Sequence, residues 1–331
     1  MSWLRWLRRL ALTVAALMLA PLAAQAQPPT SPPTGQDGMR VIFCGTSGPL
    51  PVVGRAKPCT AVQVAGSLYI VDAGPESTEN LMLWRVPVAT AKAVFITHLH
   101  SDHVVGIPDL WLTGWLEAAY AQRKGPFRVH GPAGTKALMQ GLAQAYDWDI
   151  RARTADQNLA PDNVRAEVSE FTTGVVYEQG GVKVTAFAVD HGDLLKPAVG
   201  FRVDFAGRSV TVSGDTRFSE NLIEHASGTD LLIHQVAAVR EELLKNPVFQ
   251  VILAHHTRPD EAGTLFARVK PRLAVFYHFV LLGSIGVPAV TEQDVFEMAR
   301  KTYAGPLLIG EDLMAFRLER DAVVTLPART P

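Results

Sequence analysis

The sequence predicts an α/β fold in which two β-sheets pack face to face and helices cover their outer faces. Three observations support this prediction: strand-length apolar runs occur both early and late in the chain, helical patterns are interleaved between them, and no change in composition marks a second domain. Such an order of elements is typical of a layered α/β domain. The 331 residues, 48% of them hydrophobic, are enough to build one sizeable core. We therefore expect one domain over residues 39–320, followed by a C-terminal tail at 321–331.

The first 26 residues have the three-part pattern of a secretory signal peptide. Arginines at positions 5, 8 and 9 come first, an apolar run at 10–20 follows, and Ala24-Gln25-Ala26 fits the small-x-small cleavage rule. The apolar run is short for a membrane span, which needs about 20 residues. We predict export to the periplasm or out of the cell, with no membrane contact after cleavage. Residues 27–38, rich in Pro, Ser, Thr and Gly, are predicted to form a disordered linker.

The charge of the chain argues against a nucleic-acid partner. The formal net charge is −1, from 31 basic and 32 acidic residues. Loss of the three arginines with the signal peptide leaves 28 basic residues against 32 acidic ones, a net charge of −4. Proteins that grip nucleic acid through its phosphates usually carry a basic footprint, which this composition does not provide. We therefore expect no nucleic-acid partner.

The first half of the domain is predicted to alternate short strands with helices. Apolar runs mark the strands, Ala65-Gly66-Ser67 gives a hairpin signal between two of them, and Pro75 stands at the start of a helix. Trp111 and Trp115 are one helical turn apart and are expected to pack in the core. The predicted strands are 39–44, 60–64, 68–71, 93–96 and 127–130, and the predicted helices are 76–84, 108–120 and 132–146.

The second half of the domain is predicted to contain most of the remaining strands. Residues 150–173 are polar and irregular, so we expect a loop there. Ala206-Gly207 marks a turn between two strands, and Pro259 opens a helix. The predicted strands are 175–177, 182–189, 199–205, 208–212, 231–234, 272–277, 307–308 and 314–318, and the predicted helices are 259–269 and 291–302.

The chain has two cysteines, Cys44 and Cys59, and two interpretations of them stay open. An exported protein meets an oxidising compartment, in which the pair can form a disulfide. Alternatively, each cysteine is a small buried residue without a covalent partner.

The greatest concentration of reactive side chains lies at residues 97–103, which read Thr-His-Leu-His-Ser-Asp-His. They follow the predicted strand 93–96 and precede a helical pattern, so they lie on a loop at the end of a strand. His98 and His100 are two residues apart and can point the same way from an extended segment. Asp102 and His103 follow at the turn into the helix. Imidazole and carboxylate groups suit Zn²⁺ and similar first-row metals, and this density of ligands predicts two metal ions close together.

The same run resembles the signature of the metallo-β-lactamase superfamily. That resemblance implies a single-domain αββα four-layer sandwich and further ligands in a set order: a His, a metal-bridging Asp and a final His. Candidates in this order are His191, Asp215 and His278, each of which ends an apolar run. The resemblance thus implies two Zn²⁺ ions, with Mn or Fe as substitutes, held by His98, His100, Asp102, His103, His191, Asp215 and His278.

The resemblance also implies a role for each of these residues. His98, His100 and His191 would hold one metal, and Asp102, His103 and His278 the other, with Asp215 bridging. Asp72, in Asp72-Ala73-Gly74, would support the metal loop from behind. A bridging hydroxide would act as the nucleophile. The catalytic residues would be Asp102 and His256, the latter protonating the leaving oxygen.

Further stretches resemble the branch that contains tRNase Z and the periplasmic arylsulfatase-like enzymes. Residues 256–263, His-Thr-Arg-Pro-Asp-Glu-Ala-Gly, match an element whose His is the proton donor, which favours His256 over the adjacent His255. Gln235 departs from the branch, which usually has Glu there, and would hold His256 less strongly. The opening at 45–60 has Arg55, Pro58 and Thr60 in the branch's spacing, and resemblance to the arylsulfatase-like subgroup is seen in Gly131-Pro132, Gly214-Asp215-Thr216 and Gly310-Glu311-Asp312-Leu313.

These resemblances lead us to expect an exported arylsulfatase-like hydrolase of sulfate or phosphate esters, with a small-molecule substrate. They are compatible with a homodimer. Two alternatives use the same site, a tRNase Z-like phosphodiesterase or endoribonuclease and a lactonase. A third is a non-catalytic binding protein that kept the fold. tRNase Z is disfavoured because many members grip tRNA with a long arm between the ligands matched by His191 and Asp215. Here those residues are only 24 apart, a distance that two strands and a turn fill.

Overall fold

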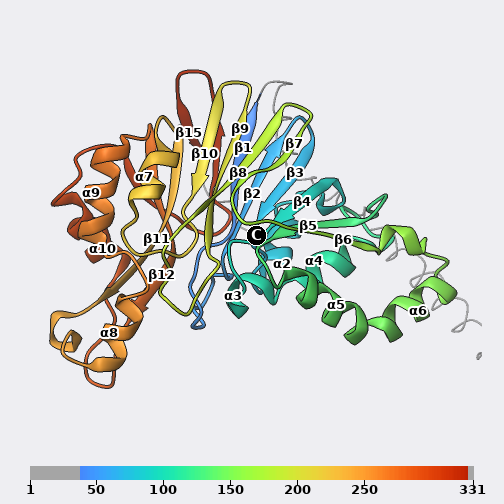
Figure 1. The fold of residues 1–331 in the computed structure, drawn as a ribbon, viewed down its shortest axis with the longest axis horizontal. Coiled ribbons are helices and arrows are strands. Elements are labelled where there is room, and N and C mark those ends of the chain that lie inside the picture. Colours follow the sequence, from blue (N-terminus) through green and yellow to red (C-terminus); the bar gives the residue numbers. More distant parts are fainter. Residues whose placement is uncertain (1–37, 327–331) are drawn as a thin grey trace, which may run out of the picture. The chain divides into compact units, whose positions relative to one another are not determined.

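The computed structural model describes residues 38–326, which form two β-sheets with helices on their outer faces (Figure 1). This arrangement confirms the predicted α/β sandwich. The predicted signal peptide at 1–26 and all but the last residue of the predicted linker at 27–38 lie outside the described residues. Among the residues that are described, no helix is long and apolar enough to cross a membrane.

The first sheet has eight strands in the order β15-β14-β1-β2-β3-β4-β5-β6. Its antiparallel part includes the predicted hairpin, and its parallel part runs from β3 to β6. Strand β15 pairs with β14, so the sheet continues into the segment that the sequence predicted as a tail. The strands are β1 (Met39–Gly45), β2 (Cys59–Val64), β3 (Ser67–Val71), β4 (Ala91–Phe95), β5 (Phe127–Gly131), β6 (Ala166–Glu170), β14 (Ala315–Leu318) and β15 (Val323–Leu326).

The second sheet has seven strands in the order β13-β12-β11-β10-β9-β8-β7. Strands β7 to β10 are antiparallel, whereas β10 to β13 are parallel and end at the same edge of the sheet. The strands are β7 (Gly174–Gln179), β8 (Val182–Ala188), β9 (Val199–Phe205), β10 (Arg208–Val212), β11 (Leu231–Val239), β12 (Leu273–Leu282) and β13 (Leu307–Ile309).

Apolar side chains fill three layers around the sheets, and a fourth, smaller cluster lies at the ends of β11 and β12. Alternation along β1 illustrates the pattern, because Val41 and Phe43 face the second sheet while Ile42 and Cys44 face the helices. Helices α2, α4 and α5 cover the first sheet, and α7, α9 and α10 cover the second (Figure 1). The helices are α2 (Ser77–Leu83), α3 (Ser101–Val104), α4 (Ile107–Thr113), α5 (Thr135–Ala145), α6 (Asp147–Asp156), α7 (Glu220–Ala226), α8 (Pro247–Leu253), α9 (Pro259–Val269) and α10 (Glu292–Arg300), with 3-10 turns at Val88–Thr90, Pro161–Asn163 and Glu241–Leu243.

The segment 150–173 differs from the loop that its composition predicted. It contains most of α6 and the whole edge strand β6. Helix α6 has no fully buried residue, contacts the core through Ile150 and carries i,i+4 ion pairs such as Asp149–Arg153, so no apolar periodicity marks it in the sequence. The prediction failed because apolar patterns reveal only elements that bury a face.

The helix predicted at 108–120 is shorter than expected, because α4 ends at Thr113. The buried guanidinium of Arg123 donates to the carbonyl of Trp111, and the backbone N–H of Arg123 donates to that of Gly114, which folds the chain back at this point. Trp111 and Trp115 are both buried, as predicted for core residues.

A disulfide joins Cys44 and Cys59, which decides between the two interpretations left open by the sequence. It connects β1 to the first residue of β2, and the two Cα atoms are 5.0 Å apart. The bond therefore anchors both ends of the 46–58 loop, which borders the cavity described below.

Candidate metal centre

The histidine-rich loop starts directly after β4 and leads into α3. Its first residue, Thr97, donates from its backbone N–H and its hydroxyl to the buried carboxylate of Asp72, each at 2.8 Å. These bonds fix the loop against the end of β3, so that His98 and His100 face the same point. His98 Nε2 lies 2.9 Å from His100 Nδ1. The same-side placement expected from their spacing is therefore observed.

The seven predicted ligands converge at one edge of the two sheets. His191 follows β8, Asp215 follows β10, and His278 lies on β12. The ligand atoms form two groups, and within each group they lie within 4.8 Å of one another. The first group is His98, His100, His191 and Asp215, and the second is Asp102, His103 and His278.

The apolar run before His278 predicted that the strand ends at this residue. The structure shows that it does not. Strand β12 continues to Leu282, and the pairing with β11 slips by one residue at this point. Gln235 pairs with Tyr277 and Val236 with Phe279, so His278 is the extra residue of a β-bulge, with φ of 44°. A bulge redirects a side chain out of the regular alternation. Here it turns the imidazole of His278 toward Asp102 and Asp215.

Asp215 lies between the two groups of ligands. Its Oδ2 atom is 3.2 Å from Nε2 of His278, 3.6 Å from that of His103, 3.7 Å from that of His191 and 4.0 Å from that of His98. This single carboxylate oxygen thus faces imidazoles of both groups. That is the position which the sequence analysis expected of a bridging ligand.

The cluster has the electrostatics of a cation site. Burial opposes ionisation of Asp215, but the imidazoles of His278 and His103 outweigh it and hold the pKa of this carboxyl well below its usual range. Burial lowers the pKa of His98 well below that of free histidine, which favours the neutral, ligating form. For His103, burial is outweighed by Asp72 and Asp215, and its pKa is raised well above the ordinary value. The carboxylates therefore attract positive charge to the position where the ring atoms converge.

Several ligand atoms have no hydrogen-bond partner among the described residues. They are Nε2 of His103, Nε2 of His278 and Oδ1 of Asp215, and all are buried. A buried polar atom without a partner costs about 1–3 kcal/mol. Nitrogen and carboxylate donors at these positions match the coordination that Zn²⁺ and related divalent ions prefer. The residues present therefore fit a divalent metal.

Hydrogen bonds from behind the ligands orient their rings. His103 Nδ1 donates to Asp72 at 2.8 Å, and His191 Nδ1 donates to the carbonyl of His255 at 2.9 Å. In both rings the Nδ1 proton is thereby held outward, and Nε2 is left for the cluster. The structure places Asp72 where a supporting residue was expected. It also reveals Thr97, which the sequence analysis had not singled out although it belongs to the motif.

His256 lies beside the ligands and is held by Gln235. His256 Nδ1 is 2.9 Å from Gln235 Oε1, while Gln235 Nε2 donates to the carbonyl of Thr216 at 2.7 Å. Because a carbonyl only accepts, the Gln235 amide must present its oxygen to His256, whose Nδ1 then carries the proton. Burial lowers the pKa of His256 to about 3. Its Nε2 is thus the ring atom left for a substrate.

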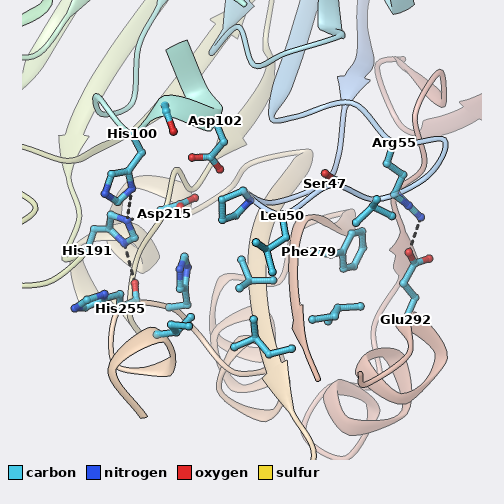
Figure 2. A pocket seen from close by; sticks show the side chains of 18 residues that line it. Ser47, Leu50, Arg55, His100, Asp102, His191, Asp215, His255, Phe279 and Glu292 are labelled. Carbon is cyan, nitrogen blue, oxygen red and sulfur yellow. Dashed lines mark hydrogen bonds and ion pairs between the residues drawn. The ribbon is translucent and has the colours of Figure 1, made fainter. Parts of the chain in front are cut away.

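A cavity of about 420 Å³ opens beside the candidate metal ligands. Figure 2 shows His100, Asp102, His191 and Asp215 at one side of it, Leu50 and Phe279 in the middle, and the ion pair of Arg55 and Glu292 at the far side. Both His255 and His256 line the cavity, so the structure keeps both near the site. Sequence patterns did not identify Leu50, Phe279 or Glu292, because they come from three separate segments.

Comparisons with known proteins agree on the family. A family model described as a beta-lactamase superfamily domain matches residues 68–279. Ribonuclease Z of Mycobacterium marinum is 32% identical over 281 residues, which cover 83% of this chain and 97% of the relative. Ribonuclease Z of Mycolicibacterium paratuberculosis is 31% identical over 290 residues, covering 86% and 99%.

Solved structures support the same fold. The metallo-beta-lactamase fold protein YhfI from Bacillus subtilis aligns with a TM-score of 0.64 and 17% identity, covering 85% of this chain and 99% of that one. The short form of human tRNase Z aligns with a TM-score of 0.60 and 20% identity, covering 83% and 98%. At these identities the likeness concerns the fold alone.

The named relatives correct two expectations from the sequence. Homologues named ribonuclease Z contradict both the assignment as an exported arylsulfatase-like hydrolase and the expectation of a small-molecule ester without nucleic acid. The short connection between His191 and Asp215 is therefore not evidence against a relationship to ribonuclease Z. This chain covers 97% of the M. marinum relative, so that relative has little sequence that this chain lacks. The two proteins therefore do not differ by a long inserted arm.

The glycine motifs that suggested the arylsulfatase-like subgroup serve packing. A Cβ atom at Gly131 would lie 2.2 Å from Oγ1 of Thr135, and one at Gly310 would lie 2.5 Å from the carbonyl oxygen of Phe276. Close packing within the fold requires glycine at these two positions, so glycine there does not by itself indicate a substrate. The chain therefore belongs to the metallo-β-lactamase superfamily of hydrolases, with ribonuclease Z proteins among its relatives.

Proposed function

We propose that this protein is a metal-dependent phosphodiesterase that cleaves RNA, an endoribonuclease of the ribonuclease Z type. The observation that carries the proposal is a complete set of seven converging ligand side chains in a chain 32% identical to a ribonuclease Z over nearly that relative's whole length. Fold alone would not support the activity, since one fold hosts many chemistries. The site and the relatives together favour phosphodiester hydrolysis.

Two divalent metals, most simply Zn²⁺, are proposed to bind in this site. One would be held by His98, His100 and His191 and the other by Asp102, His103 and His278, with Asp215 shared between them. Such a pair supplies an activated water and neutralises charge on the scissile phosphate. The protein's own contribution is to fix the ligands, through the hydrogen bonds of Asp72 and the His255 carbonyl, and to keep the cluster buried.

His256 is proposed to donate a proton to the leaving oxygen of the substrate. Gln235 fixes its ring through Nδ1, so Nε2 is the atom that can exchange a proton with a bound phosphodiester. The low pKa of His256 keeps the ring neutral at neutral pH before substrate arrives. A phosphate anion bound nearby would favour the imidazolium form, because an opposite charge within hydrogen-bonding reach stabilises it.

Metal analysis tests the assignment of the ligands. Protein stripped with a chelator and refilled with Zn²⁺ should contain about two equivalents per chain, because two groups of ligands share one carboxylate. Elemental analysis by mass spectrometry measures this directly. A stable content of one equivalent, unchanged in a variant with Asp102→Ala and His103→Ala, would rule out the two-metal arrangement.

RNA cleavage tests the proposed activity. We expect the metal-loaded protein to cut a transcript containing a tRNA, or a defined RNA oligonucleotide, at discrete positions that gel electrophoresis can map. Asp215→Ala, prepared in parallel, should leave the RNA intact, which controls for contaminating nucleases. Equal cleavage by the two preparations, or none by a wild-type protein with a full metal content, would contradict the proposal.

We propose in addition that the mature protein acts in an oxidising compartment. The Cys44–Cys59 disulfide and the signal-peptide pattern of residues 1–26 support this, because disulfides are rare in reducing cell compartments. Mass spectrometry of the protein isolated from its native cell should find Gln27 at the N-terminus and no thiol that reacts with an alkylating reagent before reduction. An uncleaved chain with two reactive thiols would place the protein in a reducing compartment instead.

A further inference from the structure

The cavity beside the candidate metal ligands has a second half to which the proposed chemistry assigns no role. This apolar half is formed by Leu50, Val52, Ile252, Phe279, Val280 and Leu282. It comes from the loop after β1, from α8 and from the end of β12. Its far end is polar, because Arg55 and Glu292 meet there at 2.7 Å. Figure 2 shows Leu50 and Phe279 between this ion pair and the metal ligands.

The apolar half is unsuited to a second phosphate group. Arg55 is the one arginine or lysine among the residues that line the cavity. Its guanidinium is already engaged by Glu292, by the Thr46 hydroxyl at 2.5 Å and by the Gly310 carbonyl at 2.8 Å. The Glu292 carboxylate would repel a phosphate anion. A nucleotide bound here would therefore leave its own phosphate outside this half of the cavity.

A nucleobase matches the apolar half in both shape and polarity. A base has two apolar faces, which stack on aromatic and apolar side chains. Leu50 is 63% exposed and offers the larger free surface, whereas Phe279 is 6% exposed and has the Arg55 guanidinium 5.2 Å from its ring centroid. It also has a polar edge that carries hydrogen-bond donors and acceptors. Glu292, whose side chain is 34% exposed and is held in place by Arg55, supplies a hydrogen-bond acceptor at the far end. Apolar walls that end in an exposed hydrogen-bond acceptor fit the apolar faces and polar edge of a base.

We propose that the apolar half is a subsite for the base of a nucleotide next to the scissile phosphate. This inference rests on the proposed RNA phosphodiesterase function. The same cavity is lined by Asp102 and Asp215, so a phosphate at the candidate metal ligands and a base in the apolar half would occupy one continuous space. The subsite binds the base by stacking, and the Glu292 carboxylate accepts a hydrogen bond from its polar edge.

The experiment compares intact RNA with RNA that lacks one base. A cleavage site is first mapped on an RNA oligonucleotide, and the nucleotides on either side of it are then replaced in turn by an abasic ribose. For the wild-type protein, removal of the base that occupies the subsite should lower kcat/KM by about 5- to 150-fold, the usual worth of one stacked base. Removal of the base on the other side should have a clearly smaller effect.

Variants assign this effect to the cavity. Leu50→Ala should lower the ratio of kcat/KM on intact RNA to kcat/KM on abasic RNA. Because the Leu50 side chain is 63% exposed, this substitution should not disturb the fold. Phe279→Leu should act in the same direction. Val53→Ala is the matched control, because Val53 lies on the same loop, is fully exposed and does not line the cavity. Glu292→Gln should change the order in which the four bases are preferred at that nucleotide.

The outcomes separate the subsite from the proposed function. Cleavage of intact and abasic RNA with equal kcat/KM would overturn the base subsite and leave the phosphodiesterase function standing. A base effect that is as large in Leu50→Ala and Phe279→Leu as in the wild type would place the base elsewhere. If no RNA is cleaved at all by protein with a full metal content, the proposed function falls, and the subsite falls with it.

Discussion

Asp215→Ala is expected to abolish hydrolysis and to release at least one metal ion. The reason is its position, because Oδ2 of Asp215 faces imidazoles of both ligand groups at 3.2–4.0 Å. Metal assistance contributes several kcal/mol to such reactions, so the loss in rate should be about 10³-fold or more. Parallel measurements of kcat/KM and of metal content would show both losses in the same variant.

Asp72→Ala is the control for the Asp215 variant. Asp72 is equally buried and accepts hydrogen bonds from Thr97 and His103, but it contacts the ligands from behind. Residues in such supporting positions typically cost about 10–100-fold in activity or metal affinity. If Asp72→Ala loses as much metal and activity as Asp215→Ala, the division into ligands and supporting residues is incorrect.

His256→Ala is expected to keep both metals and to lose about 10²–10⁴-fold in kcat on RNA, the usual worth of general acid catalysis. A ribose oxygen is a basic leaving group and needs its proton in the transition state. The loss should be clearly smaller on bis(4-nitrophenyl) phosphate, whose phenoxide leaves without a proton. Steady-state kinetics of the variant on both substrates measure the difference. Equal losses on the two would exclude a proton donor at this position.

Two further variants test how His256 works. His255→Ala should show no dependence on the leaving group, because its backbone carbonyl rather than its ring holds His191. Gln235→Glu should raise the pKa of His256, since a carboxylate facing Nδ1 favours the imidazolium where the neutral amide does not. The protonated ring would then persist to higher pH. The descending limb of the pH–rate profile should accordingly move upward by about 1–3 units, and an unmoved limb would show that another group controls it.

Local patterns predicted the buried parts of the fold well. Helix α9 was predicted at 259–269 and is observed at those residues, because Pro259 opens it and its apolar face is buried against the second sheet. Helix α6 was missed because none of its residues is fully buried and Ile150 is its one apolar residue packed against the core, so it shows no apolar periodicity. Strand β12 was predicted to end before His278, since no periodic pattern signals a bulge. Periodicity therefore indicates burial, and it fails where an element has none or where its register slips.

The substrate class was predicted incorrectly, and the reason is physical. Net charge and the missing arm argued against RNA, whereas relatives named ribonuclease Z favour it. Net charge is a property of the whole surface, but recognition depends on the few groups that line the cavity. Gly131 and Gly310, in two of the motifs that suggested another subgroup, hold the backbone close, which explains their presence without reference to a substrate.

The sequence by itself determined which side chains the candidate site contains, because the kinds of residue and their order are fixed by the covalent chain. His98, His100 and Asp102 lie within five residues, so their proximity was certain before any folding. The tertiary structure decided everything that depends on distant segments meeting. It brought Asp215 between both groups of ligands, turned His278 inward by a bulge, and set Gln235 against His256. It also joined Leu50, Phe279 and Glu292 into one cavity. Such contacts arise from packing across two sheets, and packing between segments far apart in the chain leaves no local periodicity from which it can be predicted.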